Sequence, residues 1–429
     1  MRQQLHYLFL NQYLPAEMLD ANGPKSFLPA NWILQLQDVE MRSPALQTST
    51  AAFFAARVAQ SNNDKNFAQQ CRSMYVESLK QLQIAMACPR ARLSDETLAA
   101  CMALSLYELT GGEGATGSAY MAHMRGAMAL LELRGPDASA SPLGHSLFLD
   151  LRAHEVSNFS PFPGLWPHGV YLCRAFQINR CLIQRRETFL SRPEWLAQPW
   201  NALPKSPHDD LVNMLFHFPA IFRRFDAVSR EKDQGVLRAG LCDVIAKFLE
   251  MESALQGLHE NFKRSVSSPL YWPALSTLES RLDDEKSGKL FPVSFQFPSF
   301  SVALTVTTYW SNMMVLHNQL GHVYHKLETL TKTCEDGSLP ALSSVQASYD
   351  EGGRKWEIMA KNICQSVEYL SQDHMGSLGP LAVLSFLSGC YSCFGNAAGD
   401  WSREMHWISD SMLQAKRRLQ FPTGNFLTW

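Results

Sequence analysis

The sequence is poor in charge. Asp, Glu, Lys and Arg together make up 18% of its 429 residues, against about 25% in an ordinary globular domain. Positive charge is not in excess either, because 38 Lys and Arg face 40 Asp and Glu, for a formal net charge of −2. This balance argues against direct nucleic-acid binding, which usually needs a strongly basic face. The 46% of hydrophobic residues instead supply a large core and exclude a disordered chain.

Cysteines and long hydrophobic runs are also scarce. Ten cysteines, widely and irregularly spaced, are too few for a disulfide scaffold and are typical of an intracellular, reducing compartment. The apolar N-terminal stretch is interrupted by Asn11 and Gln12 before it reaches the length of a secretory core. The most apolar later window, 378–394, contains Gly379 and Pro380 and is shorter than the roughly 20 residues of a membrane span. We therefore expect a buried helix there, with neither export nor membrane insertion.

Helical periodicity dominates the first third of the chain. Apolar residues keep to one helical face over 67–86, until proline follows the run. Ser94 is a candidate N-cap, followed by Asp and Glu where a helix N-terminus favours negative charge, and a second apolar stripe covers 98–109. A third stripe over 120–131 ends before Gly135-Pro136, a strong stop signal. The pattern predicts three consecutive helices with short connections.

The later sequence extends the helical prediction. An apolar stripe over 302–327 predicts one long, packed helix. The alternation of Phe and Val with polar residues over 291–297 is interpreted as an extended connector, because prolines flank and interrupt it. The Pro- and Trp-rich stretches 159–167 and 193–207 are expected to be ordered loops. Strand-like alternation is otherwise scarce, so we expect an all-α, large multi-helix fold over 1–429, with 193–210 as the candidate boundary between two helical lobes.

Two motifs that resemble cofactor or metal sites fail in their context. Residues 112–117 match G-x-G-x-x-G, but the segment before them has helical rather than strand periodicity, so an interhelical loop is favoured over a nucleotide site. Cys390 and Cys393 have half of a zinc-ribbon spacing with no second pair, so we expect them to pack in a helix. No cofactor is predicted.

Histidines and paired carboxylates give no site either. On the predicted helix over 302–327, His322 and His325 fall on the side away from the apolar stripe and do not converge with His317. The acidic runs 209–210 and 283–285 lie in polar segments, where we expect solvated carboxylates. No nucleophile, acid–base pair or metal-ligand set is therefore assigned.

The order of certain residues resembles a known family. The helix beginning at Tyr75 (YVESLKQLQIAM), the Leu-Tyr-Glu end of 98–108, His123-Met124-Arg125-Gly126-Ala127 and Arg134-Gly135-Pro136 follow one another in this order. This succession is similar to the regulatory region of fungal zinc-binuclear-cluster transcription factors. The resemblance is good over 60–155 and looser elsewhere. It implies an α-helical regulatory domain in a nuclear protein that controls transcription, often of a metabolic gene cluster.

The chain departs from this family in one respect. Such factors bind DNA through six N-terminal cysteines that hold two zinc ions, whereas the first cysteine here is Cys71. We therefore expect no zinc-cluster domain and no autonomous DNA binding. A true loss, dependence on a DNA-binding partner and an incomplete gene model all remain open.

The residues of the signature have a structural interpretation. Tyr107 and Glu108 end one predicted helix and His123 lies near the start of the next, so a Tyr-Glu-His hydrogen-bonded cluster is predicted across the intervening loop. Gly126 and Ala127 would permit close helix approach. Together with Arg134, these residues form a candidate cluster whose role is structural or the lining of an effector pocket.

The functional hypothesis is a non-catalytic transcriptional regulator or co-regulator of a fungal secondary-metabolite gene cluster. It would act in the nucleus through a DNA-binding transcription factor or another regulatory protein, with a small apolar effector and a homodimer as further expectations. The alternative is a helical scaffold recruited as a small-molecule-binding protein or enzyme, with a cleft lined by Tyr309, Trp310 and Trp356.

Overall fold

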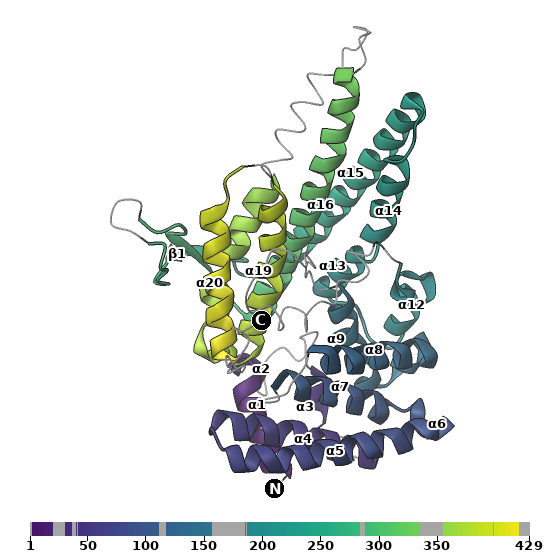
Figure 1. Ribbon diagram of the computed structural model, residues 1–429, viewed down its shortest axis with the longest axis vertical. Coiled ribbons are helices and arrows are strands. Elements are labelled where there is room, and N and C mark those ends of the chain that lie inside the picture. The colour runs from purple at the N-terminus through teal and green to yellow at the C-terminus, as the bar shows by residue number, and fades with distance from the viewer. Residues whose placement is uncertain are drawn as a thin grey trace.

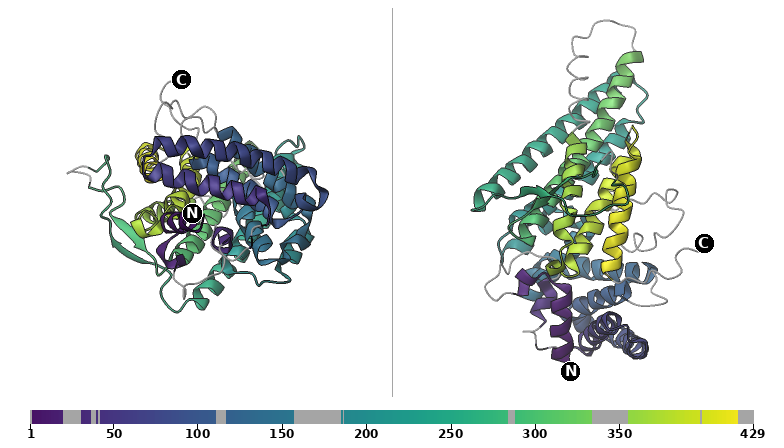
Figure 2. Two further views of the ribbon diagram at one scale, coloured as in Figure 1. Left: turned by 90° about the horizontal axis from the view of Figure 1, so that it is seen from below. Right: turned by 90° about the vertical axis from the view of Figure 1, so that its left-hand side faces the viewer.

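The computed structural model confirms the all-α prediction. It describes residues 2–19, 31–36, 40, 42–110, 117–156, 185, 187–283, 288–333, 355–397 and 399–419. Helices dominate these residues, which include only one small two-stranded sheet. Figures 1 and 2 show an elongated molecule in which the N-terminal helices form a base and two long later helices extend away from it.

The base consists of the helices up to residue 156. They are α1 (Arg2–Tyr13), α2 (Ala16–Leu19), α3 (Asn31–Gln35), α4 (Pro44–Ser61), α5 (Lys65–Ala87), α6 (Pro89–Arg92), α7 (Asp95–Thr110), α8 (Gly117–Arg134), the 3-10 helix η1 (Pro136–Ala140) and α9 (Pro142–Val156). Within this group α4 packs against α5 and α7, and α7 packs against α8. Buried aromatic side chains of α1 and α4 meet in the core, where Phe9 contacts Phe53 and Phe54.

The remaining elements form the upper part of Figure 1. They are η2 (Phe189–Ser191), α12 (Pro193–Ala197), η3 (Gln198–Trp200), α13 (Pro207–Leu215), α14 (Phe218–Val228), α15 (Gln234–Ser265), β1 (Trp272–Leu275), β2 (Val293–Gln296), α16 (Phe300–Thr333), α18 (Val367–Leu370), η4 (Asp373–Met375), α19 (Leu378–Asn396) and α20 (Ser402–Arg418). Residues 355–365 are also helical. The long helices α15 and α16 pack against each other, and α19 packs against α16 and α20.

Local signals explain where the predicted helices begin and end. The Asp64 side chain accepts a hydrogen bond from the Phe67 amide at 3.0 Å and caps α5. The predicted cap of α7 is confirmed, because the Thr97 amide donates to Ser94 Oγ at 3.2 Å. Helix α8 ends before Gly135, whose φ of 79° is left-handed and favours glycine. The three predicted helices over 67–131 are therefore present as α5, α7 and α8.

Two later helices also agree with the sequence. The stripe over 302–327 is part of α16, a single helix of 34 residues. The apolar window is α19, and Leu378–Gly395 is long and apolar enough to cross a membrane. However, 72% of that window is buried inside the protein, as in the core helix that the sequence predicts.

The expected connector over 291–297 is wrong in part, because Val293–Gln296 forms strand β2. It pairs antiparallel with β1, and Trp272 lies opposite Gln296. The prolines at 292 and 298 flank β2 rather than interrupt it, so they remove no hydrogen bond from the ladder. The partner strand β1 contains Pro273 and gave no clear strand pattern in the sequence.

The Pro- and Trp-rich stretch 193–207 is ordered, as expected, but part of it is helical. It contains α12 and η3, and Trp195 and Pro199 are buried. The other stretch, 159–167, lies outside the described residues, as does most of the 112–117 motif. The element before that motif is helix α7 and the one after it is helix α8. The division into two lobes near 193–210 stays a prediction.

Candidate functional site

The first turn of α7 joins three other helices. Glu96 accepts a hydrogen bond from the Arg42 amide at 3.2 Å and one from the Ser43 amide. It thereby caps α4, whose own N-cap residue, Ser43, makes no side-chain cap bond. The neighbouring Asp95 faces the other way, toward the end of α8 and the start of α9. Two adjacent carboxylates therefore fix the helix ends around them.

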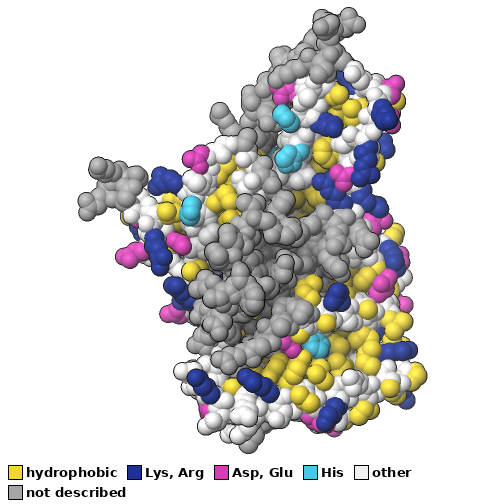
Figure 3. All heavy atoms as spheres, viewed as in Figure 1, with side chains coloured by type: hydrophobic (Ala, Val, Ile, Leu, Met, Phe, Trp, Pro, Cys, Tyr) yellow, Lys and Arg dark blue, Asp and Glu magenta, His cyan; other side chains and the backbone are white. Residues whose placement is uncertain are grey.

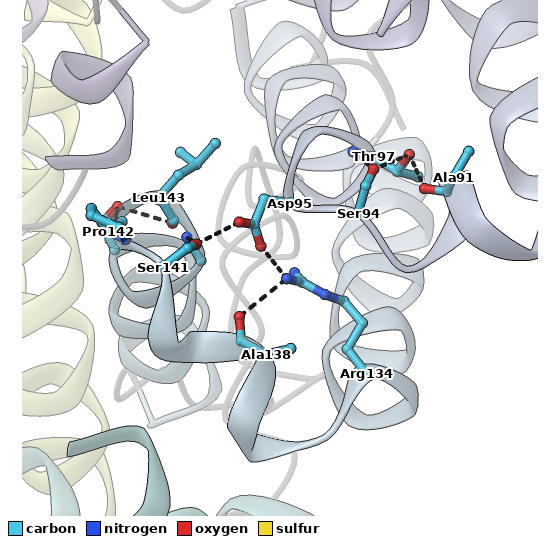
Figure 4. Close-up of polar contacts among 11 residues, drawn as sticks. Ala91, Ser94, Asp95, Thr97, Arg134, Ala138, Ser141, Pro142 and Leu143 are labelled. Atoms are coloured by element: carbon cyan, nitrogen blue, oxygen red, sulfur yellow. Dashed lines mark hydrogen bonds and ion pairs between the residues drawn. The ribbon is translucent and has the colours of Figure 1, made fainter. Parts of the chain in front are cut away.

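Asp95 and Arg134 form the centre of this arrangement, which Figure 4 shows. The Arg134 guanidinium forms an ion pair with Asp95, and its side chain is only 3% exposed. Its Nη2 also donates to the Ala138 carbonyl at 3.3 Å. On the opposite side, Ser141 Oγ donates to Asp95 Oδ2 at 2.5 Å and accepts from the Gly144 amide at 2.8 Å. We call Asp95, Arg134, Ser141 and Gly144 the α7–α9 lock.

Gly144 is required by the lock for a steric reason. A Cβ added to it would lie 2.6 Å from the Ala138 carbonyl oxygen and 2.8 Å from both Asp95 Oδ1 and Ser141 Oγ. The family resemblance singles out Arg134, whereas the sequence does not indicate this glycine. A lone Gly near a helix start gives no signal of such an approach, because the atoms it meets come from other elements.

A second cluster contains Glu108 and His123, which are joined by a tyrosine other than Tyr107. Tyr75 of α5 donates to Glu108, and its hydroxyl lies 3.1 Å from His123 Nε2. Tyr107 stacks on the Tyr75 ring instead, with ring centroids 4.4 Å apart. Tyr75 was identified only as part of the family motif, because the sequence could not show that α5 reaches the junction of α7 and α8.

The partial burial of this cluster shifts the pKa of each of its three residues. Burial raises the pKa of Glu108, although the hydrogen bond from Tyr75 opposes that effect. Burial also lowers the pKa of His123 and, together with Glu108, raises that of Tyr75. The neutral forms of the imidazole and the phenol are thus favoured. We call Tyr75, Glu108 and His123 the tyrosine cluster.

The expectation for Gly126 is wrong. This residue is exposed, and a Cβ added to it would meet no atom within 4 Å. No helix of the described residues approaches α8 at this point. Its neighbour Ala127 is fully buried, because the next residue of a helix points about 100° away. Gly126 therefore contributes to an outer face of α8 and to no interhelical contact.

In the acidic pair 209–210, Asp209 is not solvated as expected, whereas Asp210 is partly exposed. Asp209 is 3% exposed and forms an ion pair with Arg152 of α9 at 2.5 Å. Arg152 also donates to Asn213 at 2.9 Å, and its guanidinium lies 4.7 Å from the centroid of the Trp200 ring. Because Asp209 also caps α13 through Ser206, this pair ties the start of α13 to α9.

The histidines of α16 have different environments. His322 and His325 are exposed, whereas His317 is 1% exposed and its Nε2 lies 3.4 Å from Glu252 Oε1 of α15. Lys355 reaches the same carboxylate oxygen at 3.6 Å. Burial lowers the pKa of His317 to about 4. Within the described ranges, no group of three or more His, Cys, Asp and Glu side chains could hold a metal ion; Cys390 and Cys393 are buried thiols.

The three aromatic residues of the alternative hypothesis are buried in separate contacts of the described structure. Tyr309, Trp310 and Trp356 are each at most 8% exposed, and they belong to separate clusters. Tyr309 stacks on His259 of α15, Trp310 packs against aromatic residues around the β-ribbon, and Trp356 packs against Phe394 of α19. Among the described residues, these three side chains are part of the buried core.

The segment that contains the lock and the tyrosine cluster is similar to a known domain. Residues 31–162 match the fungal specific transcription factor domain. The resemblance predicted from the sequence is thereby confirmed for this segment. Over 258 residues the chain is 24% identical to an uncharacterized protein of Emericella nidulans, an alignment that covers 56% of this chain and 49% of the relative. The chain thus spans about half the length of this curated relative. No solved structure matches it.

The segment that matches the fungal specific transcription factor domain contains both polar clusters. All four residues of the lock and all three of the tyrosine cluster lie within 31–162. Arg152 also lies within the domain, whereas its partner Asp209 does not. The chain beyond the matched segment is consequently joined to the domain through a buried ion pair.

Proposed function

We propose that this protein is a transcriptional regulator or co-regulator of a fungal metabolic gene cluster, one for a secondary metabolite, and that it acts in the nucleus. The observation that supports the proposal is the match of residues 31–162 to the fungal specific transcription factor domain. The buried lock gives this segment a fixed arrangement of helices, as a surface that recognises another protein requires.

The proposed mechanism is recognition through helix surfaces rather than direct DNA contact. We propose a DNA-binding transcription factor or another regulatory protein as the partner, with a second copy of the chain and a small apolar effector as further ligands. One surface suits such contacts. Hydrophobic side chains gather on the lower part of the face in Figure 3, over the base helices. The outer side of α8 adds Gly126 and Leu133, of which Leu133 is 58% exposed.

Chromatin immunoprecipitation of the tagged full chain, followed by gel shift of the purified chain on the recovered DNA, tests the proposal. We expect enrichment of promoter DNA in cells and no sequence-specific shift with the purified chain alone. Extract from the same cells should restore a shift that contains the chain. A tight, salt-resistant shift by the purified chain would contradict action through partners, and the absence of any enrichment would contradict a regulatory role.

A further inference from the structure

A pocket of about 410 Å³ lies outside the matched domain, between the residues that follow β1, helix α18 and the last turns of α20. Its volume falls in the range of small-molecule sites, roughly 300–1,000 Å³. One wall is a single face of α20, because Ser411, Gln414 and Arg418 follow one another at helical spacing. Ser411, Gln414 and Arg418 are polar, whereas the adjacent face of α20 is apolar.

The opposite wall is held firmly in place. The Glu368 carboxylate accepts hydrogen bonds from the hydroxyls of Ser276 and Thr277, each at 2.7 Å, and from the Leu278 amide at 3.3 Å. On the far side, Lys289 Nζ donates to the Ser276 and Leu278 carbonyls at 2.8 and 2.9 Å. Backbone donors and acceptors of this wall are thus already satisfied. Such a wall needs no ordering when a ligand binds.

Other polar groups of the pocket have no such partners. In the part of the chain that the structure describes, the side chains of Ser371, Gln414 and Glu279 make no hydrogen bond. Arg418 uses one nitrogen, in an ion pair with Asp373. The Asp373 side chain is 96% exposed, and surface pairs of this kind contribute little. Most of the five guanidinium donors therefore remain available.

The charges of the pocket indicate the ligand. Arg418 is a donor suited to a carboxylate, and Glu279, also on the lining and exposed, is an acceptor suited to an ammonium group. We propose that this pocket binds a small zwitterionic metabolite of amino-acid size, with its carboxylate on Arg418 and its ammonium group near Glu279. The site does not depend on the proposed transcriptional role.

Isothermal titration calorimetry of the full chain tests the site, with L-glutamine as the probe. Succinate, which lacks the ammonium group, and putrescine, which lacks the carboxylate, are the comparison compounds. We expect saturable binding of L-glutamine and at least tenfold weaker binding of the other two, since each loses one charge-assisted contact. Absence of saturable heat with millimolar L-glutamine would overturn the proposal, as would equal binding of succinate or putrescine.

Variants locate the binding. Arg418→Gln and Glu279→Gln should each weaken L-glutamine binding by about tenfold or more. Arg417→Gln is the matched control, because Arg417 lies in the same last turn of α20 but does not line the pocket; it should leave affinity unchanged. Circular dichroism confirms that each variant is folded. Binding that survives both pocket variants, or that falls equally in the control, would place the ligand elsewhere.

Discussion

Arg134 at the end of α8 forms a buried ion pair with Asp95 in the first turn of α7, 39 residues earlier in the chain. Arg134 lies at the C-terminus of α8, where the helix dipole favours positive charge. Asp95 lies at the N-terminus of α7, where the dipole favours negative charge, so both dipoles stabilise the pair. The pair is the centre of the lock that fixes α7, α8 and α9.

Removing this arginine should destabilise the fold strongly. We expect Arg134→Ala to lower the free energy of unfolding by about 3 kcal/mol, because Asp95 would be left partly buried without its partner. Arg192→Ala is the control, since its pair with Glu132 has side chains 54% and 45% exposed and should contribute under about 1 kcal/mol. Denaturant unfolding compares the two. Equal losses would show that the lock does not stabilise the domain.

Two glycines on successive helices should respond in opposite directions to the same substitution. Gly144→Ala forces a Cβ against the Ala138 carbonyl and the lock, so a loss of about 1–3 kcal/mol is expected. Gly126→Ala fills open space in a helix and should stabilise by about 0.5–1 kcal/mol. Thermal unfolding midpoints report both changes. A stabilising Gly144→Ala would mean that the start of α9 is not as closely packed as described.

The tyrosine cluster permits a test of structural against functional roles. Tyr75→Phe removes the hydroxyl that contacts both Glu108 and His123, and should destabilise by about 1–2 kcal/mol. His123→Ala should also lower the unfolding midpoint if the cluster is structural. A His123→Ala variant that melts like the parent but no longer activates or represses its genes would instead indicate an effector pocket, as measured by transcript levels.

Stability should fall on mild acidification through His317. Its pKa is lowered to about 4 by burial, whereas the unfolded chain binds a proton near pH 6.5. Between these two pH values the unfolded state binds more protons than the folded state. The contribution of His317 to the free energy of unfolding is therefore fully present above pH 6.5 and is lost as the pH falls toward 4. The loss is about 3 kcal/mol. His317→Leu should flatten this part of the pH profile, while His374→Leu, at an exposed site, should not.

The outer face of α8 can be tested by charge insertion. Leu133→Glu should weaken co-precipitation of the proposed partner by tenfold or more, because a carboxylate would be desolvated in the contact. Leu249→Glu is the control. It makes the same substitution on α15, outside the matched segment, at a side chain that is 46% exposed, and it should not change binding. If neither variant affects binding, the partner uses another surface.

The sequence by itself determined several of the helices and the resemblance of residues 31–162 to the fungal specific transcription factor domain. Helices α5, α7, α8 and α16 follow from apolar spacing, and the caps at Ser94 and Gly135 from residue type, because these signals act within one or two turns of the chain. The order of the motif residues was likewise readable without coordinates.

Only the tertiary structure decided which side chains meet. Tyr75 rather than Tyr107 bonds Glu108, although 33 residues separate them, and Asp209 is buried by Arg152, 57 residues before it. The strand at 293–296 needed a partner strand to be recognised. The close approach expected at Gly126 is found at Gly144 instead. Such contacts depend on how helices cross and rotate against one another, and a single sequence carries no local signal of that geometry.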